Sequence, residues 1–325
     1  MIRKVLLATL NYDHPQTGMF RAFAGVFGPG NVAEYDYYQA HRHGKPIQVV
    51  TSEFVAAAKA FQPDWIWMQV QGSGIISSNG IEEVGRALPR CVISHWMGDL
   101  RVHVDSYLTS ICRAAHLTLI SNRGQHELFK AAGAREVRYC QIGLDWDEDV
   151  MGLPWTPTFS VPDVVLCGNH YGDSFPGTKA REEAVQTLMD AHVNVGIVGG
   201  QWPRGYPVVG ACTVKQQLGV YRKAKVCLSV SHYNDIPGFY SDRLLIAMAS
   251  GTPVVAHYCP GLHYDVPWDS VYTYSDVARL PDLVAKAMED REIGARSRAA
   301  AIRNHSWFSR ITDLLPVIEK IRAGL

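Results

Sequence analysis

Short and almost wholly apolar runs recur along the first half of the chain, with amphipathic segments between them. The runs cover residues 5–10, 65–70, 91–94, 117–120 and 137–142. Apolar runs of this length without polar alternation are typical of strands buried on both faces, as in parallel sheets. The segments between them have helical spacing, and the one at 51–61 is expected to begin with Thr51 or Ser52 as its N-cap. The alternation therefore predicts a parallel sheet covered by helices on both faces.

A polar interruption divides this pattern near the middle of the chain. Residues 143–163 carry four acidic residues and three prolines before Asp163, and they lack apolar periodicity. The alternation then restarts, with expected strands at 164–168, 193–200, 226–231 and 253–258. The pattern predicts two doubly wound α/β domains, 1–158 and 159–305, and a terminal helix at 306–325 that packs back across the domains. One extended sheet is the alternative, which the interruption disfavours.

Composition supports a folded two-domain protein. The 325 residues are 47% hydrophobic and 19% charged, which excludes a disordered chain. Lys and Arg number 31 and so do Asp and Glu, and this balance argues against nucleic-acid binding through phosphate contacts, although a local patch is compatible with it. The compact basic run at 41–45 is interpreted as a solvated loop.

Cysteine usage and the amino-terminal segment bear on location. The seven cysteines are scattered and form no Cys-x-x-Cys pair, as expected for reduced thiols in a cytoplasm. The apolar run at 5–10 is too short for a signal-peptide core or a membrane span. We therefore expect a cytoplasmic protein without a transmembrane segment.

The junction at 234–255, NDIPGFYSDRLLIAMASGTPVV, combines a polar loop with an almost uncharged helix. Ser241 is a good N-cap, Asp242 complements the positive end of the helix, and Gly251 ends it. Arg243 needs an anionic partner because it stands in the first turn of an otherwise buried helix. That partner is Asp242, Asp235 or a phosphate bound at the helix start.

The sequence at 229–262, SVSHYNDIPGFYSDRLLIAMASGTPVVAHYCPGL, resembles group 1 glycosyltransferases, particularly the subgroup of the CgeB-type spore-maturation protein. The similarity extends through DVVLCGNHYGDSFPGTKAREE at 163–183 and VGIVGGQWP at 195–203, and more loosely into the first half. It implies the GT-B fold, in which two Rossmann-like domains face a central cleft. It also implies transfer of a sugar from a nucleotide diphosphate sugar, such as a UDP-sugar, to a hydroxyl acceptor, with no cofactor besides this co-substrate.

The resemblance assigns donor-side roles to particular residues. Gly168 matches the diphosphate loop, with Lys179 and Arg181 as basic partners, although a solvated helix start explains these two cations equally well. Residues that match the strand ends framing the nucleotide base are Gly199, Gly200, Val209 and Gly210. Residues that match the loop and helix start facing the donor phosphates and sugar are Tyr240, Ser241, Asp242 and Arg243.

The chain departs from this family at one motif. Many members have a Glu-x7-Glu pair whose second glutamate holds the ribose of the nucleotide, but Gly238 and Ile246 occupy those two positions here. Either another residue such as Asp242 recognises the ribose, or the chain has lost ordinary donor binding.

Candidate acceptor-side residues follow expected strands of the first domain. His95 and Asp99 are expected just after a strand end, as a pair that includes the general base of an inverting transfer. A packed, hydrogen-bonded histidine is the alternative reading of His95. Asp13 and His14 are rival bases in the loop at 11–19, where Gly18 leaves room for backbone approach. Gln71 opens a glycine-rich segment that is interpreted as an acceptor loop or a flexible turn.

Metal binding is not expected. Asp145 and Asp147 form an Asp-x-Asp spacing, but they lie in the polar interruption and are interpreted as surface acids, so the transfer is expected to be metal-independent. The acceptor class stays open among a glycan, a small aglycone, a protein and a modified DNA base, and so does the oligomeric state. Two rival functions are a sugar-nucleotide epimerase on the same fold and a degenerate, non-catalytic binding protein.

Overall fold

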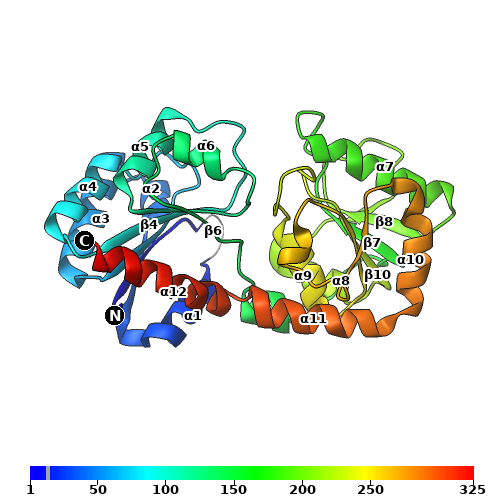
Figure 1. Ribbon diagram of the computed structural model, residues 1–325. Helices are drawn as coiled ribbons and strands as arrows, with labels where there is room; N and C mark the ends of the chain where they lie inside the picture. The colour runs from blue at the N-terminus through cyan, green and yellow to red at the C-terminus, as the bar shows by residue number, and fades with distance from the viewer. Residues whose placement is uncertain (12–14) are drawn as a thin grey trace. The chain divides into compact units, whose positions relative to one another are not determined.

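The computed structural model describes residues 1–11 and 15–325 and divides them into two compact units (Figure 1). The first comprises Met1–Gly143 and Trp307–Leu325, and the second comprises Leu144–Ser306. The division falls at Gly143 rather than after residue 158, because the polar stretch that follows folds onto the second unit. Leu144 is buried there and its N–H donates to the carbonyl of His305 over 2.7 Å.

A six-stranded parallel sheet forms the middle of the first unit. Its strands are β1 (Val5–Thr9), β2 (Val32–Asp36), β3 (Trp65–Gln69), β4 (Val92–Met97), β5 (Leu117–Ile120) and β6 (Val137–Tyr139), in the order β2-β1-β3-β4-β5-β6. One face packs against α2 (Tyr37–Arg42), α3 (Ile47–Phe61), α4 (Ser78–Ala87), α5 (Ser106–Ala114) and α6 (His126–Ala131). The other face packs against α1 (Thr17–Phe27) and α12 (Trp307–Ala323), which lie below the sheet in Figure 1.

The core between the sheet and α12 is built on tryptophans. The Trp307 ring meets the Trp67 ring edge-on at 6.0 Å and the Trp96 ring at 5.7 Å. Its helix buries Ile311, Leu314 and Ile318 on the same face. The terminal helix is therefore an integral layer of the first unit.

The second unit repeats the plan with the order β12-β11-β10-β7-β8-β9. Its strands are β7 (Val164–Cys167), β8 (Val195–Val198), β9 (Val208–Gly210), β10 (Val226–Ser229), β11 (Val254–His257) and β12 (Tyr272–Tyr274), all parallel. Its helices are α7 (Pro176–Asp190), α8 (Gln217–Tyr221), α9 (Asp242–Ser250), α10 (Leu280–Glu289) and α11 (Arg291–His305). Helices α7 and α10 share one hydrophobic core with the sheet. The predicted class, two doubly wound α/β domains, is confirmed.

Shorter helical turns complete the connections. They are η1 (Pro29–Asn31), the π-helical η2 (Trp146–Met151), η3 (Val214–Gln216), η4 (Leu262–Tyr264) and η5 (Val277–Arg279).

The predicted N-cap is correct in α9 and wrong in α3. Ser241 caps α9 as predicted, because its Oγ accepts the N–H of Arg243 over 3.2 Å, and Gly251 ends the helix at a φ of 81°. Thr51 and Ser52, in contrast, lie inside α3, which begins one turn earlier at Ile47. The apolar face of this helix continues to Val50, which is buried, so packing sets the start in place of a side-chain cap.

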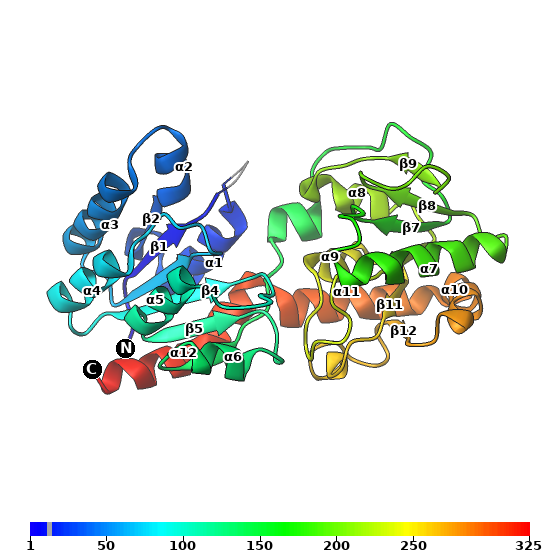
Figure 2. The same cartoon turned by 90° about the horizontal axis from the view of Figure 1, so that it is seen from above.

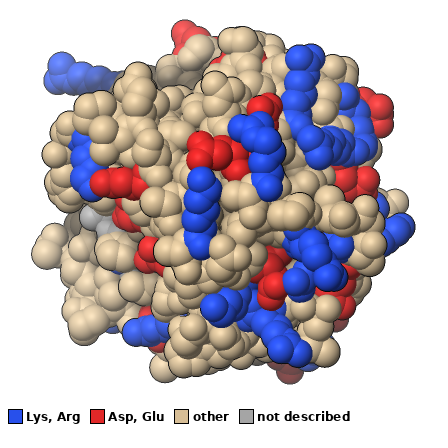
Figure 3. Space-filling view, turned by 90° about the vertical axis from the view of Figure 1, so that its left-hand side faces the viewer, with Lys and Arg blue, Asp and Glu red and all other residues tan. Residues whose placement is uncertain are grey.

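Charged side chains are mixed on the face drawn in Figure 3, where lysines and arginines alternate with acidic residues. No helix in the described part of the chain is long and apolar enough to cross a membrane.

Candidate functional site

The strand order of the second unit reverses between β7 and β10, and ligands of doubly wound sheets bind at such a switch point. The two connections that leave these strands are in direct contact. The N–H of Gly177, in the first turn of α7, donates to the carbonyl of His232 over 2.7 Å. A Cβ at Gly177 would stand 2.2 Å from the backbone oxygen of Ser231, so only glycine allows this approach.

Arg181 lies buried at this point, 0% exposed. Its Nε donates to the carbonyl of Val230 over 2.9 Å and its Nη1 to the carbonyl of Asn169 over 2.8 Å, while its Nη2 is buried without a partner. Burial, together with the charge of Arg243, lowers the pKa of Arg181 to about 10. No carboxylate among the described residues pairs with it, so its charge is uncompensated and adds positive potential at the switch point.

Arg243 supplies a second cation from the start of α9. Its side chain is 19% exposed, its Nη1 lies 3.7 Å from Oδ1 of Asp242, and its Nε is buried without a partner. Burial disfavours its charge, but Asp242 and the phenols of Tyr221 and Tyr171 outweigh burial and raise its pKa. Of the partners expected from the sequence, Asp242 is therefore present, and it leaves Nε of the guanidinium without a hydrogen bond.

His232 joins the two arginines from the loop after β10. The rings of Tyr171 and Phe175 pack around it at 4.7 and 5.2 Å, and its Nδ1 is buried without a partner. Burial and the charges of Arg181 and Arg243 lower its pKa to about 3. We call Arg181, His232 and Arg243 the switch-point cluster. Its histidine is neutral at physiological pH, and Asp242, 3.7 Å from Arg243, is the carboxylate that partly balances its two cations.

The predicted glycines lie beside this cluster at the ends of β7 and β8. The N–H of Gly168 donates to the carbonyl of Val198 over 3.0 Å, and that of Gly200 donates to Oδ1 of Asn169 over 2.8 Å. The N–H of Gly199 is bonded to the carbonyl of Gly210, the last residue of β9, which also contains Val209. The structure thus brings the expected base-framing residues to the same sheet edge as Gly168.

Two other predicted donor residues lie apart from the cluster. Lys179 is on the solvent side of α7 with its side chain 84% exposed, 3.8 Å from Glu183, which matches the solvated alternative. Tyr240 is 3% exposed and its ring packs edge-on against His305, so it supports the loop before α9.

The two positions of the missing glutamates have structural roles of their own. Gly238 has a φ of 67°, a conformation that strains a glutamate, and Ile246 is 1% exposed within the apolar body of α9. A carboxylate could not reach a ligand from either place without changing the backbone or the core.

The structure corrects the prediction for His95. This residue lies within β4, which runs to Met97, and it is 0% exposed with Nε2 2.9 Å from Oγ1 of Thr118. Burial lowers its pKa to about 4. The strand continues beyond its expected end at residue 94, so His95 is a packed, hydrogen-bonded core residue and its side chain is not accessible to a substrate.

Asp99 and Gln71 do lie at the carboxyl edge of the first sheet. The Asp99 side chain is 72% exposed, and its Oδ2 lies 3.8 Å from Nη2 of Arg101. The same Nη2 donates to the backbone carbonyl of Gln71 over 2.5 Å. Arg101, which sequence reasoning missed, therefore links the loops after β3 and β4.

The loop after β1 was predicted in part. Asp13 and His14 lie outside the described residues, and Gly18 is inside α1, where it is buried. Sequence reasoning missed a polar network at the ends of β1 to β3, in which Nδ2 of Asn11 donates to Oδ2 of Asp36 over 2.7 Å and Nε2 of Gln16 donates to Oε1 of Gln69 over 2.7 Å. Polar residues directly after buried runs were the available signal.

The acidic residues of the Asp-x-Asp sequence form hydrogen bonds that stabilise a local turn. Oδ1 of Asp145 accepts the N–H of Asp147, and Oδ2 of Asp149 accepts the N–H of Asp145, both over 2.9 Å. Within the described residues, no three His, Cys, Asp or Glu side chains are grouped so that they could hold a metal ion.

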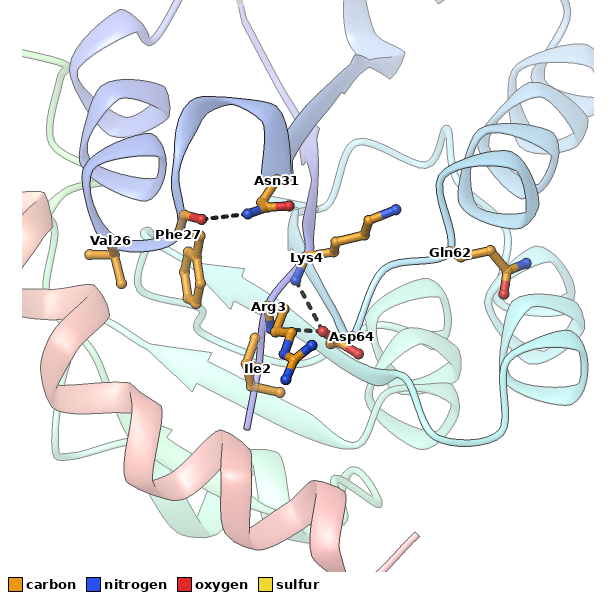
Figure 4. A pocket seen from close by; sticks show the side chains of 8 residues that line it. All are labelled: Ile2, Arg3, Lys4, Val26, Phe27, Asn31, Gln62 and Asp64. Carbon is orange, nitrogen blue, oxygen red and sulfur yellow. Dashed lines mark hydrogen bonds between the residues drawn. The ribbon is translucent and has the colours of Figure 1, made fainter.

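A cavity of about 670 Å³ opens at the opposite, amino-terminal edge of the first sheet (Figure 4). Asp64 accepts the backbone N–H groups of Arg3 and Lys4 there over 2.7 and 3.0 Å, and it pairs with Arg322 of α12. These contacts tie the chain ends to the sheet, and ligand sites of this fold class occupy the other edge.

Comparisons with known proteins agree with this architecture. Residues 180–316, which contain the switch-point cluster, match a family model described as glycosyl transferase-like. A comparison of the sequence with curated proteins found no significant match.

Several solved structures superpose on nearly the whole chain. HepE of Anabaena in complex with UDP-glucose has a TM-score of 0.61 at 13% identity, covering 99% of this chain and 100% of HepE. AviGT4, a glycosyltransferase involved in avilamycin A biosynthesis, has a TM-score of 0.63 at 12% identity over 99% and 98% of the two chains. A glycosyltransferase from Rickettsia africae gives 0.62 at 9% identity over 98% of each. The chain therefore has the GT-B fold.

Proposed function

We propose that this protein is a group 1, CgeB-like glycosyltransferase that moves a sugar, in particular a hexose, from a nucleotide diphosphate sugar to a hydroxyl acceptor. The observation that carries the proposal is Arg243, a cation whose side chain is 19% exposed at the switch point of the second sheet, together with the buried, uncompensated charge of Arg181 beside it. A diphosphate has the charge and the acceptor oxygens that such a pair requires. UDP-glucose in the similar HepE structure and the family match over 180–316 support this choice of donor.

The cluster suits the chemistry of the leaving group. Negative charge grows on the diphosphate as the glycosidic bond breaks, and fixed cations placed at that charge lower the barrier. Arg181 is held by two carbonyl groups, and α9 begins beside Arg243 with the positive end of its dipole. On this basis we propose a metal-independent transfer, in which Arg243 contacts the diphosphate and the buried charge of Arg181 adds positive potential there, in place of the divalent cation that other transferases use.

The nucleoside is proposed to lie over the ends of β7 and β8, beside Gly168, Gly199 and Gly200. Asp242 is the proposed ribose contact, because it is the carboxylate next to the cluster and the two family positions cannot supply one. A UDP-sugar is the proposed donor and the cytoplasm the proposed location.

On the acceptor side, Asp99 is the proposed general base of the described residues, since its carboxylate is exposed at the edge where loops of this fold bind substrate. Asp13 and His14 stay predictions. A retaining transfer along one face needs no separate protein base, in which case Asp99 only orients the acceptor.

The testing experiment is a thermal-shift and calorimetric panel of UDP-, GDP-, ADP- and dTDP-sugars, each with EDTA and with Mg²⁺, followed by product analysis. We expect one UDP-sugar to stabilise the protein in EDTA and to yield a glycoside only when an acceptor is present. Conversion of the donor to an epimeric sugar nucleotide without acceptor would indicate the epimerase instead. The absence of stabilisation by every nucleotide sugar, while a partner protein binds, would support the degenerate protein.

A further inference from the structure

Aromatic side chains gather in the loop that follows β11. Tyr258 stands directly after the strand, His263 and Tyr264 belong to η4, and Trp268 follows four residues later. We call these four residues the aromatic platform. Figure 2 shows the turn, drawn in gold, on the same side of the second unit as α9.

The rings of the platform are ordered as a stack. The Trp268 ring is parallel to the His263 ring within 9° at a centroid distance of 4.9 Å, and parallel to the Tyr258 ring within 9° at 6.1 Å. The Tyr258 hydroxyl lies 3.5 Å from Nδ1 of His263. Even so, Trp268 is 62% exposed and Tyr264 is 74% exposed, so broad ring surface is open to solvent.

Buried residues of the same loop hold the platform in place. Cys259, Leu262 and Val266 are each 2% exposed and point into the unit while the aromatic rings point out. The carbonyl of Asp265 accepts a hydrogen bond from Nε2 of His305 at 3.0 Å when that nitrogen is protonated. The rings therefore meet a ligand without first having to be ordered, which lowers the entropic cost of binding.

The platform is continuous with the switch-point cluster through the backbone. The N–H of Gly238 donates to the carbonyl of Pro260 over 2.8 Å, which joins the platform loop to the loop that precedes α9 and Arg243. Strands β10 and β11, which lead to the two loops, are neighbours in the sheet. A molecule on the platform is thus next to the loop of the proposed donor site.

A saccharide fits the chemistry of this surface. One face of a pyranose ring presents C–H groups that pack on an aromatic plane, and its hydroxyls hydrogen-bond to groups at the rim such as the Tyr258 hydroxyl and the His263 imidazole. The charged residues within the loop, Asp265 and Asp269, are acidic, which disfavours a phosphate-rich polymer. Two exposed rings also offer far less than the roughly 800 Å² per partner of a typical protein interface.

We propose that the aromatic platform binds a sugar ring of the acceptor, so that the acceptor is a glycan or a glycoside. The identification of the bound sugar as the acceptor rests on the proposed transferase function. The saccharide site itself depends on the four rings and not on the donor chemistry.

The test is saccharide binding in the absence of any nucleotide, by a glycan array followed by calorimetry with the best oligosaccharide. We expect Trp268→Ala to weaken that binding about tenfold or more, and Trp268→Phe, which keeps a ring, to weaken it less. The matched control is Trp146→Ala, which removes another exposed tryptophan of the same unit, 51% exposed, and should leave the affinity unchanged. Arg243→Ala should also leave it unchanged, because that variant addresses the donor alone.

Two results would overturn the platform: no glycan binds the wild-type protein, or Trp268→Ala binds as tightly as Trp146→Ala. A change of oligomeric state or of vesicle binding in Trp268→Ala, with glycan affinity intact, would instead assign the rings to self-association or to a lipid surface and would also overturn it. In the transfer assay Trp268→Ala should raise the KM for the acceptor with the KM for the donor unchanged. Glycan binding without transfer would refute the proposed function and support the saccharide site on the platform. Transfer with an unchanged acceptor KM in Trp268→Ala would support the proposed function and refute the saccharide site.

Discussion

Replacing Arg243 with alanine should separate donor binding from folding. A hydrogen bond to a charged group contributes about 1.5–3 kcal/mol, so loss of the Arg243 contacts should raise the Kd for UDP or the UDP-sugar roughly 10- to 100-fold. The ligand-free Tm should change little, because removal of Arg243 relieves its repulsion of Arg181 but also loses its attraction to Asp242 and to the phenols of Tyr221 and Tyr171. Arg243→Lys keeps the charge but lacks the Nε donor, so its Kd for the donor should lie between those of the wild-type protein and Arg243→Ala.

Thermal shift with titrated ligand measures both effects. At a ligand concentration about 100 times the wild-type Kd, binding stabilises the protein by about 2.7 kcal/mol, and a 100-fold weaker site leaves about 0.4 kcal/mol. The difference corresponds to a loss of roughly 5 to 9 °C of ligand-induced shift for a domain of this size. Lys179→Ala is the matched control, since it removes a cation from the exposed face of α7, and it should keep the full shift. Wild-type affinity in Arg243→Ala, or equal losses in Lys179→Ala, would refute the assignment of the anion site.

Three further substitutions test particular contacts. His95→Gln should retain transfer activity and should weaken the dependence of stability on acidic pH. The pKa of His95 in the folded state is lowered to about 4, so its contribution to the unfolding free energy is fully present above about pH 6.5, and up to about 3 kcal/mol is lost as the pH falls to 4. Urea unfolding at pH 6.5 and pH 4 measures this loss, and an unchanged pH dependence in the variant contradicts it. Gly177→Ala should cost about 1–3 kcal/mol of unfolding free energy and raise the donor KM, because its Cβ meets the backbone of Ser231; a neutral effect on both disproves that close approach. Ile246→Glu should destabilise the second unit by more than about 3 kcal/mol without improving donor affinity, whereas tighter donor binding would show that the family's ribose contact can be restored.

The inner strands of both sheets were predictable from the sequence, and several outer strands were not. β2, β9 and β12 are edge strands of their sheets, and the apolar pattern predicted none of them; only the family resemblance placed Val209 and Gly210 of β9 at a strand end. Each has half-exposed residues, such as Ala33 in β2 and Val209 in β9, so the continuous apolar run that marks a central strand is missing. Each is determined by its pairing with the strand that precedes it in the chain, β1, β8 or β11.

The residues of the candidate site at the start of α9 were predictable from helix-capping patterns. The site residues that depend on where a strand ends and which side chains are buried were not. Ser241 and Arg243 could be placed from the capping pattern of α9 alone. His232 was missed, although it follows a buried strand by the same rule that selected His95. The difference between these two histidines lies in where each strand stops, and the sequence pattern does not resolve that to within two residues.

The return of α12 to the first unit has a consequence for the order of events during synthesis. Trp67 and Trp96 receive their cover from Trp307, which leaves the ribosome after every residue of the second unit. The second unit is a continuous insertion, 144–306, and can complete its sheet while the first still lacks a layer. A nascent chain halted before Trp307 therefore displays an uncovered tryptophan surface, which favours association with chaperones until the residues of α12 have been made.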